Sequence, residues 1–471
     1  MEKILVELFE KKFGFPARDI AMLKGDGSDR KIFRLTGKAK SAIGVFNPDQ
    51  KENQAFVGFS RHFRRAKLPV PEIYAEDAAN GAYLEEDLGG VTLYSLLSSR
   101  PEGGPIPNDI LRLYRQAVKF LPQFQIRAGK TLDYSLCYPR ASFDAQSMLW
   151  DLNYFKYYFL TLAQVPFHEQ ALENDFHRFI QYLQGADRRF FLYRDFQSRN
   201  IMVKNDAPYF IDYQGGRKGA LQYDIASLLY DAKADLPPEF RDELLARYIE
   251  EARKVAPINV EKFLRYYPGY VYIRIMQAMG AYGLRGFHQR KPHFLQSIPY
   301  AIRNIERLLR TTKLPVECPE LLGVFKTLVA SSWLRQFGEA RLGLTVRVQS
   351  FSYRGGVPAD EHGHGGGFVF DCRALPNPGR LSRYAKMTGK DAPVIAFLQK
   401  EPAVRRFLSH AQALLAESVD NYKSRNFTDL FVAFGCTGGR HRSVYCAETM
   451  AEFLRRRGDV AVEISHRGGE A

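Results

Sequence analysis

The sequence predicts two domains, an α+β domain followed by a smaller α/β domain, and three observations support this expectation. The chain has 471 residues, which exceeds what a single hydrophobic core usually organises. Candidate strands near the N-terminus precede two long spans, about residues 109–185 and 237–309, in which apolar residues recur at helical spacing. Beyond about residue 341, strands, loops and helices alternate as they do in a separate α/β domain. We therefore expect domains at residues 1–337 and 343–471.

The composition is that of a folded protein. Hydrophobic residues make up 45% of the chain and aromatic residues 13%, which excludes a disordered protein. No run approaches the roughly 20 apolar residues that a membrane helix needs, and residues 1–14 have the pattern of a surface helix rather than a signal peptide. The five cysteines form no CxxC pair, which argues against a disulfide framework and a zinc site. We therefore expect a cytoplasmic protein without membrane contact.

The chain is also basic. Its 67 Lys and Arg residues exceed its 52 Asp and Glu residues by 15, and the sequence pI is about 9.4. This excess favours polyanionic partners, either RNA or phosphorylated small molecules, and it does not choose between them. A basic surface without any such partner would have the same composition.

The stretch with the most chemical information is Phe191–Val203, FLYRDFQSRNIMV. It places Asp195 five residues before Asn200, and the short apolar strand that follows ends at Asp212. Phosphoryl transfer needs a group that orients an acceptor hydroxyl and accepts its proton, which a loop carboxylate can do. Mg²⁺ prefers carboxylate and amide oxygens, which Asp212 and Asn200 offer. These residues are also ordinary in turns and caps, so the apolar strand that follows is what strengthens the signal.

Together with the downstream segment Tyr223–Leu229, this order resembles the aminoglycoside phosphotransferase and choline kinase branch of the protein-kinase-like fold. The resemblance implies a bilobal α+β domain that uses ATP and Mg²⁺. It implies that Asp195 is the catalytic base and that Asn200 and Asp212 are metal ligands.

Two neighbouring positions bear on this resemblance. Asp224 lies where the family has a structural aspartate that braces the catalytic loop, and Tyr193 stands where the family usually has His. The His position is mainly structural, so the resemblance still implies an active enzyme.

A turn near the N-terminus is the candidate site for the nucleotide phosphates. It contains Gly25, Gly27, Ser28 and Arg30, between two candidate strands. Small residues allow backbone N–H groups to approach phosphate oxygens, although a plain hairpin turn would have the same pattern. The position of the turn ahead of the catalytic loop favours the nucleotide-covering role.

The cation that holds the phosphates is not evident from the sequence. Many kinases place a lysine in the strand that corresponds to Ala42–Phe46, and this strand contains none. The candidates are Lys38, Lys40 and Arg30. Glu52, near the start of a predicted helix, is either the partner of this cation or a solvated acid that suits the helix dipole.

Two further resemblances concern the substrates. The segment Tyr83–Gly90, which contains Glu86, resembles the hinge between kinase lobes, where backbone groups would bind adenine. The segments Tyr282–Arg290 and Ser297–Ala301 are similar to the closing helices of AmgK-type kinases, the anomeric kinases of N-acetylmuramate and N-acetylglucosamine. The second resemblance implies an amino-sugar hydroxyl as the acceptor.

A second chemical site is predicted near the C-terminus. The apolar strand Phe431–Phe434 runs into a glycine-rich loop, and an amphipathic helix follows over Val444–Arg456. A loop between a strand and a helix N-terminus presents several N–H donors to one anion, so we expect a phosphate-binding site. The loop consists of Cys436, Thr437, Gly438, Gly439, Arg440, His441, Arg442 and Ser443.

The same loop fits the C-x5-R-[ST] spacing of cysteine phosphatases. In that interpretation Cys436 is the nucleophile and Arg442 clamps the phosphate. We favour binding over catalysis because Gly435 precedes the cysteine, where the phosphatase signature has His. A purely structural glycine turn is the third interpretation.

Residues 343–467 resemble the C-terminal domain of RapZ, the RNase adaptor protein. The shared motifs are Ser350–Tyr353, Phe370–Arg373, Leu375–Pro378, the GCTGGRHRS loop and His466–Arg467. The resemblance implies a domain that senses glucosamine 6-phosphate and that contributes to RNA binding and homo-oligomer formation. The P-loop domain of RapZ is replaced here by the kinase-like domain, so ligand binding is the property that transfers most directly.

Two functions follow from these expectations. The first is an ATP- and Mg²⁺-dependent kinase of an amino sugar, joined to a domain that senses a phosphorylated amino sugar, which suits feedback control in cell-wall precursor metabolism. The alternative is an RNA-binding regulatory adaptor of RapZ type whose kinase-like domain senses nucleotide. The set Asp195, Asn200 and Asp212 favours catalysis, because a sensor does not need the base.

Overall fold

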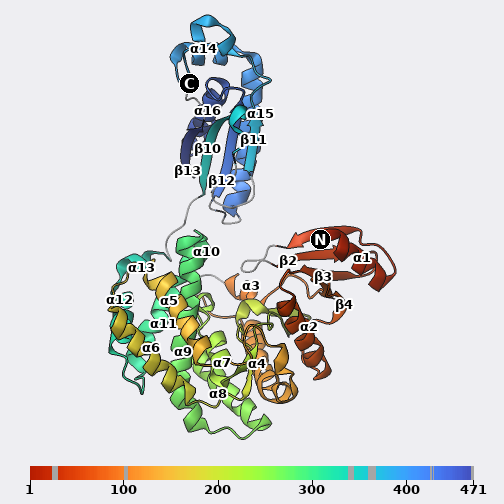
Figure 1. Ribbon diagram of the computed structural model, residues 1–471, viewed down its shortest axis with the longest axis vertical. Helices are drawn as coiled ribbons and strands as arrows, with labels where there is room; N and C mark the ends of the chain where they lie inside the picture. Colours follow the sequence, from red (N-terminus) through yellow and green to blue (C-terminus); the bar gives the residue numbers. More distant parts are fainter. Residues whose placement is uncertain are drawn as a thin grey trace. The chain divides into compact units, whose positions relative to one another are not determined.

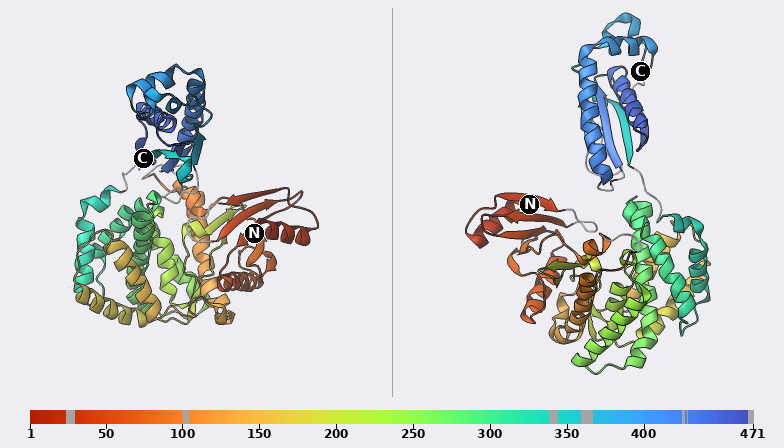
Figure 2. Two further views of the ribbon diagram at one scale, coloured as in Figure 1. Left: turned by 45° about the horizontal axis from the view of Figure 1, so that its top comes forward. Right: turned by 180° about the vertical axis from the view of Figure 1, so that it is seen from behind.

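The structure, a computed structural model, describes residues 1–23, 30–99, 104–337, 344–358, 367–424, 427 and 429–467. The chain divides into two compact units, residues 1–339 and 340–471 (Figures 1 and 2). Each unit has its own hydrophobic core, and the first unit also has a small second core within its N-terminal sheet. None of the helices in these ranges combines the length and the apolar composition that crossing a bilayer requires.

The first unit begins with a five-stranded antiparallel sheet of order β1-β2-β3-β5-β4. Its elements are α1 (Glu2–Phe13), β1 (Asp19–Leu23), β2 (Lys31–Thr36), β3 (Ser41–Phe46), α2 (Gln50–Arg65), β4 (Ile73–Asp77) and β5 (Ala82–Glu86). Alternate side chains face opposite sides of the sheet, so Leu35 packs against α1 while Tyr83 stacks on Phe56 of α2. At Gly44 in β3 a Cβ atom would lie 3.1 Å from Leu5 Cδ1 of α1 and 2.7 Å from Leu35 Cδ1 of β2, so α1 packs closely on the sheet at this glycine.

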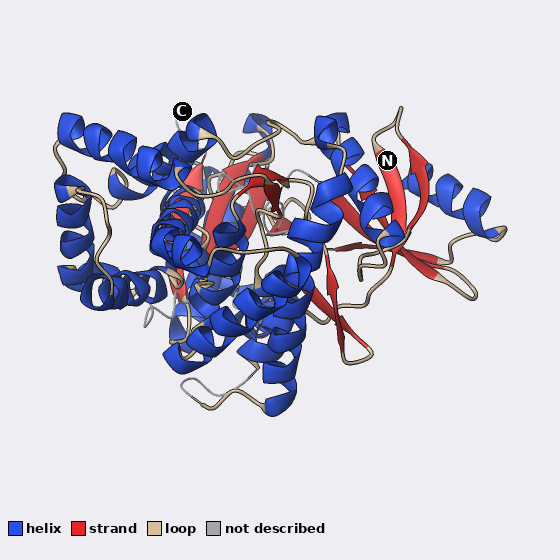
Figure 3. Cartoon of the chain, turned by 90° about the horizontal axis from the view of Figure 1, so that it is seen from below, coloured by secondary structure: helices blue, strands red, loops and turns tan. Residues whose placement is uncertain are grey.

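Helices form most of the remainder of the first unit (Figure 3). They are α3 (Leu93–Ser98), α4 (Asn108–Pro122), α5 (Ala145–Phe155), α6 (Glu169–Gln184), α7 (Leu221–Leu229), α8 (Pro238–Val255), α9 (Val260–Tyr282), α10 (Pro292–Leu295), α11 (Ile298–Thr311), α12 (Pro319–Ala330) and α13 (Ser332–Gln336). Helix α9 packs against α5, α7 and α11. Two antiparallel strand pairs complete the lobe, β6 (Phe190–Leu192) with β9 (Arg217–Gly219) and β7 (Ile201–Lys204) with β8 (Ala207–Phe210).

The second unit contains a four-stranded parallel sheet of order β11-β12-β10-β13. Its elements are β10 (Thr345–Ser352), β11 (Gly367–Asp371), α14 (Ala392–Lys400), α15 (Pro402–Ser424), β12 (Asp429–Cys436), α16 (Arg442–Arg457) and β13 (Ala461–Arg467). Val348 and Val432 are buried in one core with residues of the three helices. At the carboxyl edge of the sheet, the end of β12 and the N-terminus of α16 are joined by the loop that begins at Cys436, which is where ligands bind in open α/β sheets.

Candidate active site

The loop between β6 and β7 brings the three predicted catalytic residues together. The loop ends in a short 3-10 helix, Ser198–Asn200, which turns the Asn200 side chain back towards the loop. Its Nδ2 donates to the backbone oxygen of Asp195 at 2.9 Å and to Oδ2 of Asp212 at 3.1 Å. Asp212 follows β8 and has a φ of 68°, a left-handed conformation that is strained for an aspartate and is characteristic of functional sites. The Asn200 amide therefore links the main chain at Asp195 to the carboxylate of Asp212.

Asp224, on α7, fixes the backbone of this loop. It is fully buried, and it accepts hydrogen bonds from the N–H groups of Tyr193 (2.8 Å) and Arg194 (3.0 Å) and from the side-chain amide of Gln125 (2.6 Å). Burial raises the pKa of Asp224 to about 7, although these three donors oppose the rise. This is the bracing role that the sequence predicts for Asp224.

Tyr193, at the position where the family usually has His, is part of the core. Its side chain is fully buried, and its hydroxyl donates to the backbone oxygen of Ile211 at 2.7 Å. The hydrogen bond ties the catalytic loop to the segment that carries Asp212. A histidine could make the same type of link, which explains why tyrosine substitutes here without disturbing the loop.

Burial also affects the proposed base, Asp195. Burial raises its pKa above the usual value, the nearby Arg194 opposes this rise, and Asp212 adds to it. A carboxylate with a raised pKa is a stronger proton acceptor, which suits a general base.

We expect the pH dependence of phosphoryl transfer to report this shift. The base must be ionised, so kcat/KM should fall as the pH drops through the raised pKa of Asp195. The acidic limb should therefore lie above about pH 4, where an unperturbed aspartate titrates. A pH–rate profile, with circular dichroism to show that the fold persists, measures this. A rate that stayed constant down to pH 4 would contradict the expectation.

On the nucleotide side, Gly25, Gly27 and Ser28 lie outside the described residues. Arg30, immediately before β2, donates from Nη2 to Oδ1 of Asp212 at 2.7 Å. Burial lowers the pKa of Arg30, but the charges of Asp212 and Glu52, with Tyr83, raise it further than burial lowers it. Arg30 therefore pairs directly with the predicted metal ligand Asp212 and also interacts with the charge of Glu52.

The other two candidate cations do not reach this region. Lys38 and Lys40 are exposed, in the turn between β2 and β3. Glu52 lies in the first turn of α2, where Asp49 caps the helix, and its carboxylate accepts a hydrogen bond from Asn47 at 2.8 Å. Of the three cations that the sequence leaves open, the fold brings Arg30 to the site.

Glu86 takes part in a structural link at the predicted hinge. Its carboxylate accepts a hydrogen bond from Lys204 Nζ at 2.7 Å, and its N–H donates to the backbone oxygen of Glu72 at 2.8 Å. The preceding residue, Glu85, was not evident from the sequence. Burial raises the pKa of Glu85 to about 8, with Arg30 opposing and Asp212 adding to this rise, so this carboxyl group belongs to the electrostatic environment of Asp212.

The site residues fit a magnesium ion that is shared with phosphates. Asp212 and Asn200 supply the hard oxygen donors that Mg²⁺ prefers. The described part of the chain contains no group of three or more His, Cys, Asp and Glu side chains that could hold a metal by itself. Phosphate oxygens and water would therefore complete the coordination, as is usual for Mg²⁺.

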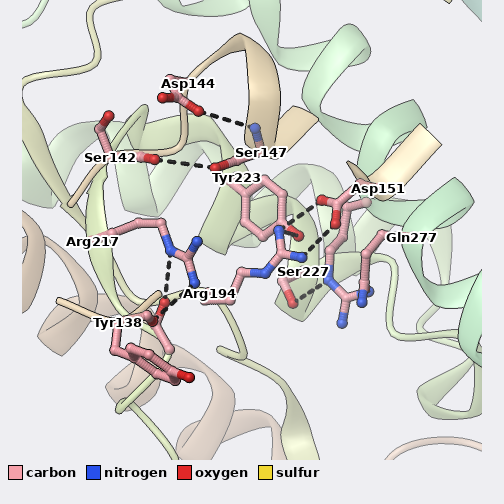
Figure 4. Close-up of polar contacts among 12 residues, drawn as sticks. Tyr138, Ser142, Asp144, Ser147, Asp151, Arg194, Arg217, Tyr223, Ser227 and Gln277 are labelled. Atoms are coloured by element: carbon pink, nitrogen blue, oxygen red, sulfur yellow. Dashed lines mark hydrogen bonds and ion pairs between the residues drawn. The ribbon is translucent and has the colours of Figure 1, made fainter. Parts of the chain in front are cut away.

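Arg194, next to the base, is held in an unusual backbone conformation. Its φ is 83°, and its guanidinium donates to both carboxylate oxygens of Asp151 (2.6 and 2.7 Å) and lies 2.7 Å from the hydroxyl of Tyr223 (Figure 4). This bidentate pair holds the Arg194 side chain, while Asp224 holds its backbone N–H. Asp151 was missed in the sequence because it lies on α5, in a pattern typical of an ordinary core helix.

In the second unit, the loop donors converge on a cysteine. Burial raises the pKa of Cys436, but hydrogen bonds from the Ser443 hydroxyl and from the N–H groups of Ser443, Gly439 and Arg440 outweigh burial, so the pKa is lowered. The Cys436 Sγ and Ser443 Oγ atoms are 3.1 Å apart. The loop therefore has the anion-stabilising arrangement that the sequence predicts.

The basic side chains of this loop are occupied by backbone groups. Arg440 donates to the oxygen of Lys386 at 3.2 Å, and His441 Nε2 lies 3.0 Å from the oxygen of Tyr384. Arg442 is buried and donates to the carbonyl oxygens at positions 373 (2.7 Å) and 375 (3.0 Å). These bonds hold the loop in place, and Arg442 Nε is a buried donor that has no partner among the described residues.

Gly439→Ala should destabilise the second unit by about 1 kcal/mol or more. Gly439 has a φ of 65°, and an added Cβ would lie 3.0 Å from the backbone nitrogen of Ser352. Gly438→Ala is the matched control, because its Cβ would meet nothing within 4 Å. Calorimetric unfolding of the full chain measures the difference, and equal transitions for the two variants would contradict it.

Comparison with known proteins gives two family matches. Residues 19–258 match the model of the phosphotransferase enzyme family, and residues 344–470 match the RapZ C-terminal domain. A nucleotide-binding protein of Burkholderia thailandensis is 39% identical over 135 residues, and one of Methylibium petroleiphilum is 39% identical over 137 residues. These alignments cover 28% and 29% of this chain, and the chain spans only 44% and 43% of the length of the two relatives.

Two kinases are among the solved structures to which this chain is similar. The choline kinase of Streptococcus pneumoniae has a TM-score of 0.44 at 15% identity, covering 65% of this chain and 99% of its own. The ADP-bound aminoglycoside phosphotransferase APH(2'')-Ib has a TM-score of 0.38 at 12% identity, covering 72% of this chain and 99% of its own.

Proposed function

This chain belongs to the phosphotransferase enzyme family, whose model matches residues 19–258, and from that premise we propose that it transfers a phosphoryl group from ATP to a hydroxyl group of a small molecule. The observation that supports this most directly is the arrangement of Asp195, Asn200 and Asp212. The Asn200 amide links the backbone oxygen of Asp195 to the carboxylate of Asp212, and Asp224 holds the backbone N–H groups of the two residues before Asp195. A protein that only sensed nucleotide would not need a positioned base.

In the proposed reaction, Asp195 orients the acceptor hydroxyl and accepts its proton. Asn200 and Asp212 would hold Mg²⁺, which neutralises charge on the phosphates when it is bound. Asn200 also keeps Asp195 and Asp212 at a fixed separation through its two hydrogen bonds. Arg30 adds a positive charge on the nucleotide side, where the phosphates lie in a site of this kind.

Arg30→Gln should raise the KM for ATP by about tenfold, because a charge-assisted hydrogen bond contributes about 1.5–3 kcal/mol. The KM for ATP of Arg30→Lys should lie between those of Arg30→Gln and the wild type, since lysine keeps the charge but lacks the paired donors of the guanidinium group. Lys38→Gln is the control, because Lys38 is exposed. Steady-state kinetics measure the effect. A larger rise of the KM for ATP in Lys38→Gln than in Arg30→Gln would show that Arg30 is not the cation that binds the nucleotide.

We further propose that the acceptor is an amino sugar of the N-acetylmuramate or N-acetylglucosamine type. The support is the likeness of Tyr282–Arg290 and Ser297–Ala301 to the AmgK-type kinases. The test is transfer from ATP with magnesium to N-acetylmuramate, N-acetylglucosamine, glucosamine, choline and an aminoglycoside, with Asp195→Asn as the blank. Turnover of a sugar supports the proposal. ATP binding without turnover of any acceptor would favour a regulatory role.

For the second unit we propose binding of a phosphorylated amino sugar, on the basis of the match to the RapZ C-terminal domain and the N–H groups directed at Cys436. Binding of this ligand would allow feedback on the kinase. Titration calorimetry with glucosamine 6-phosphate tests the binding. Its effect on the apparent affinity for ATP tests the coupling, which thermodynamic linkage makes reciprocal.

The second candidate function is RNA binding, which the match to RapZ and the net charge of +15 favour. Such binding should weaken steeply with added salt.

We propose that the protein is cytoplasmic, because its five cysteines are free thiols, as is usual in a reducing compartment. A homo-oligomer, as the RapZ resemblance implies, is testable by light scattering.

A further inference from the structure

Two buried arginines near the catalytic base have no role in the mechanism so far. Arg217 is the first residue of β9 and pairs with Leu192, the last residue of β6 before the catalytic loop. Arg274 lies on α9, which packs against α7. Each side chain is only 7% exposed. The charges of both arginines, together with that of Arg194, act on Asp195.

These two guanidinium groups are bound by neutral partners. Arg217 donates to the backbone oxygens of Gly215 (3.0 Å) and Tyr138 (3.5 Å). Arg274 donates to the Ser227 hydroxyl (2.9 Å) and to the side-chain oxygen of Gln277 (2.6 Å). Figure 4 shows Arg217, Tyr138, Ser227 and Gln277 in one cluster.

Arg194, in the same cluster, differs from Arg217 and Arg274 because it forms an ion pair. Arg194 is neutralised by a bidentate pair with Asp151, whereas neither Arg217 nor Arg274 forms an ion pair with any carboxylate in the described ranges. Burial, followed by the charge of Arg194, lowers the pKa of Arg217, as expected for an unneutralised cation. The Asp195 charge acts on both groups and the Asp151 charge acts on Arg217, but neither carboxylate forms a direct ion pair with them. A buried cation without a direct ion pair is costly, so an anionic ligand that supplied one would be favoured.

Both groups also retain donor capacity. Nη1 of Arg217 and Nη2 of Arg274 have no hydrogen-bond partner among the described residues. Neither nitrogen is among the fully buried atoms that lack a partner, so each keeps some solvent exposure. The guanidinium fork matches a carboxylate or a phosphate group.

We infer that the acceptor of this phosphotransferase carries an anionic group, a carboxylate or a phosphate, that is bound by Arg217 and Arg274 while its hydroxyl faces Asp195. The inference rests on the proposed function and narrows its substrate class. A cationic acceptor would be repelled at this position, and a neutral acceptor would leave both guanidinium groups without a direct ion pair.

The experiment compares each neutral sugar with an anionic derivative of it. N-acetylmuramate is N-acetylglucosamine with an added carboxylate-bearing lactyl group, and glucose 6-phosphate differs from glucose by a phosphate. For each pair, kcat/KM is measured with the full chain, and binding is measured separately by calorimetry in the presence of a non-hydrolysable ATP analogue. We expect at least one anionic member to be preferred about tenfold or more.

The variants are Arg217→Gln and Arg274→Gln, with the corresponding lysine variants. Each glutamine substitution should lower the ratio of kcat/KM for the anionic acceptor to kcat/KM for the neutral acceptor about tenfold, and the lysine substitution should restore part of this ratio. The matched control is Arg188→Gln, in a separate basic cavity of about 490 Å³ lined by Arg188, Arg189, Lys218 and Lys262 among others. The control should leave the ratio as in the wild type.

The outcomes separate this inference from the proposed function. Turnover of neutral acceptors with no preference for either anionic member would overturn the inference and leave the kinase proposal intact. Binding of an anionic member that is lost in the glutamine variants, without turnover of any acceptor, would support the anion site and contradict catalysis. If neither anionic member is preferred in turnover or in binding, or if Arg188→Gln lowers the ratio equally, the inference is wrong.

Discussion

Asp195→Asn should lower kcat about 10³-fold, which is within the range that positioned general bases contribute. The amide that replaces the carboxylate cannot accept the proton of the acceptor hydroxyl. The loop should keep its shape, because Asn200 binds the backbone oxygen of Asp195 and Asp224 binds the N–H groups of the two preceding residues. The expected effect is therefore on kcat, with little change in the KM for ATP.

The control for this prediction is Asp206→Asn. Asp206 lies in the exposed turn between β7 and β8 with a φ of 57°, a conformation that asparagine tolerates. The control removes one carboxylate from the same lobe and should retain full activity. Equal activity in the Asp195 variant and the wild type would show that another group is the base, and equal losses in both variants would point to a general effect of charge.

Asp224→Ala should release the catalytic loop and destabilise it by about 3 kcal/mol, because three buried donors lose a charged acceptor. These donors are the N–H groups of Tyr193 and Arg194 and the amide of Gln125. Loss of this brace should also reduce phosphoryl transfer, since the position of Asp195 depends on the two residues before it.

Hydrogen exchange of the segment 190–200 gives a direct reading of this release. A local loss of about 3 kcal/mol corresponds to exchange about 10²-fold faster. Asp224→Asn is the matched control, because it keeps one acceptor oxygen and the size of the side chain, and its effect should be smaller. Unchanged exchange in Asp224→Ala would show that the loop is held by other contacts, the pair of Arg194 with Asp151 foremost.

The catalytic loop could be predicted from the sequence because its residues are nearly contiguous. Asp195 and Asn200 lie on one loop, and Asp212 ends the strand pair that follows, so local spacing indicates their proximity. The predicted order of an α+β domain and a smaller α/β domain is confirmed, and the structure adds that the sheet of the second is parallel. The choice among Lys38, Lys40 and Arg30 depended on where β2 begins, which spacing does not determine.

Other site residues could not be predicted because they come from distant elements. Asp151 and Arg274 lie on helices in which the apolar spacing is typical of core packing. Arg217 is five residues after Asp212 and could have been noticed, but its lack of an acidic partner is a property of the folded chain. In the second unit, the sequence identified the loop but could not show that Arg440 and Arg442 bind backbone oxygens.

Because each unit has its own hydrophobic core, the melting temperature of each unit can report whether a ligand is bound to it. A ligand that binds only the folded form of one unit stabilises that unit by RT ln(1 + [L]/Kd), and a separate core confines the gain to that unit. ATP should thus raise the melting temperature of the unit that contains Asp195, and glucosamine 6-phosphate that of the unit that contains Cys436. A ligand that raised both melting temperatures would reveal energetic communication along the chain without any assay of catalysis.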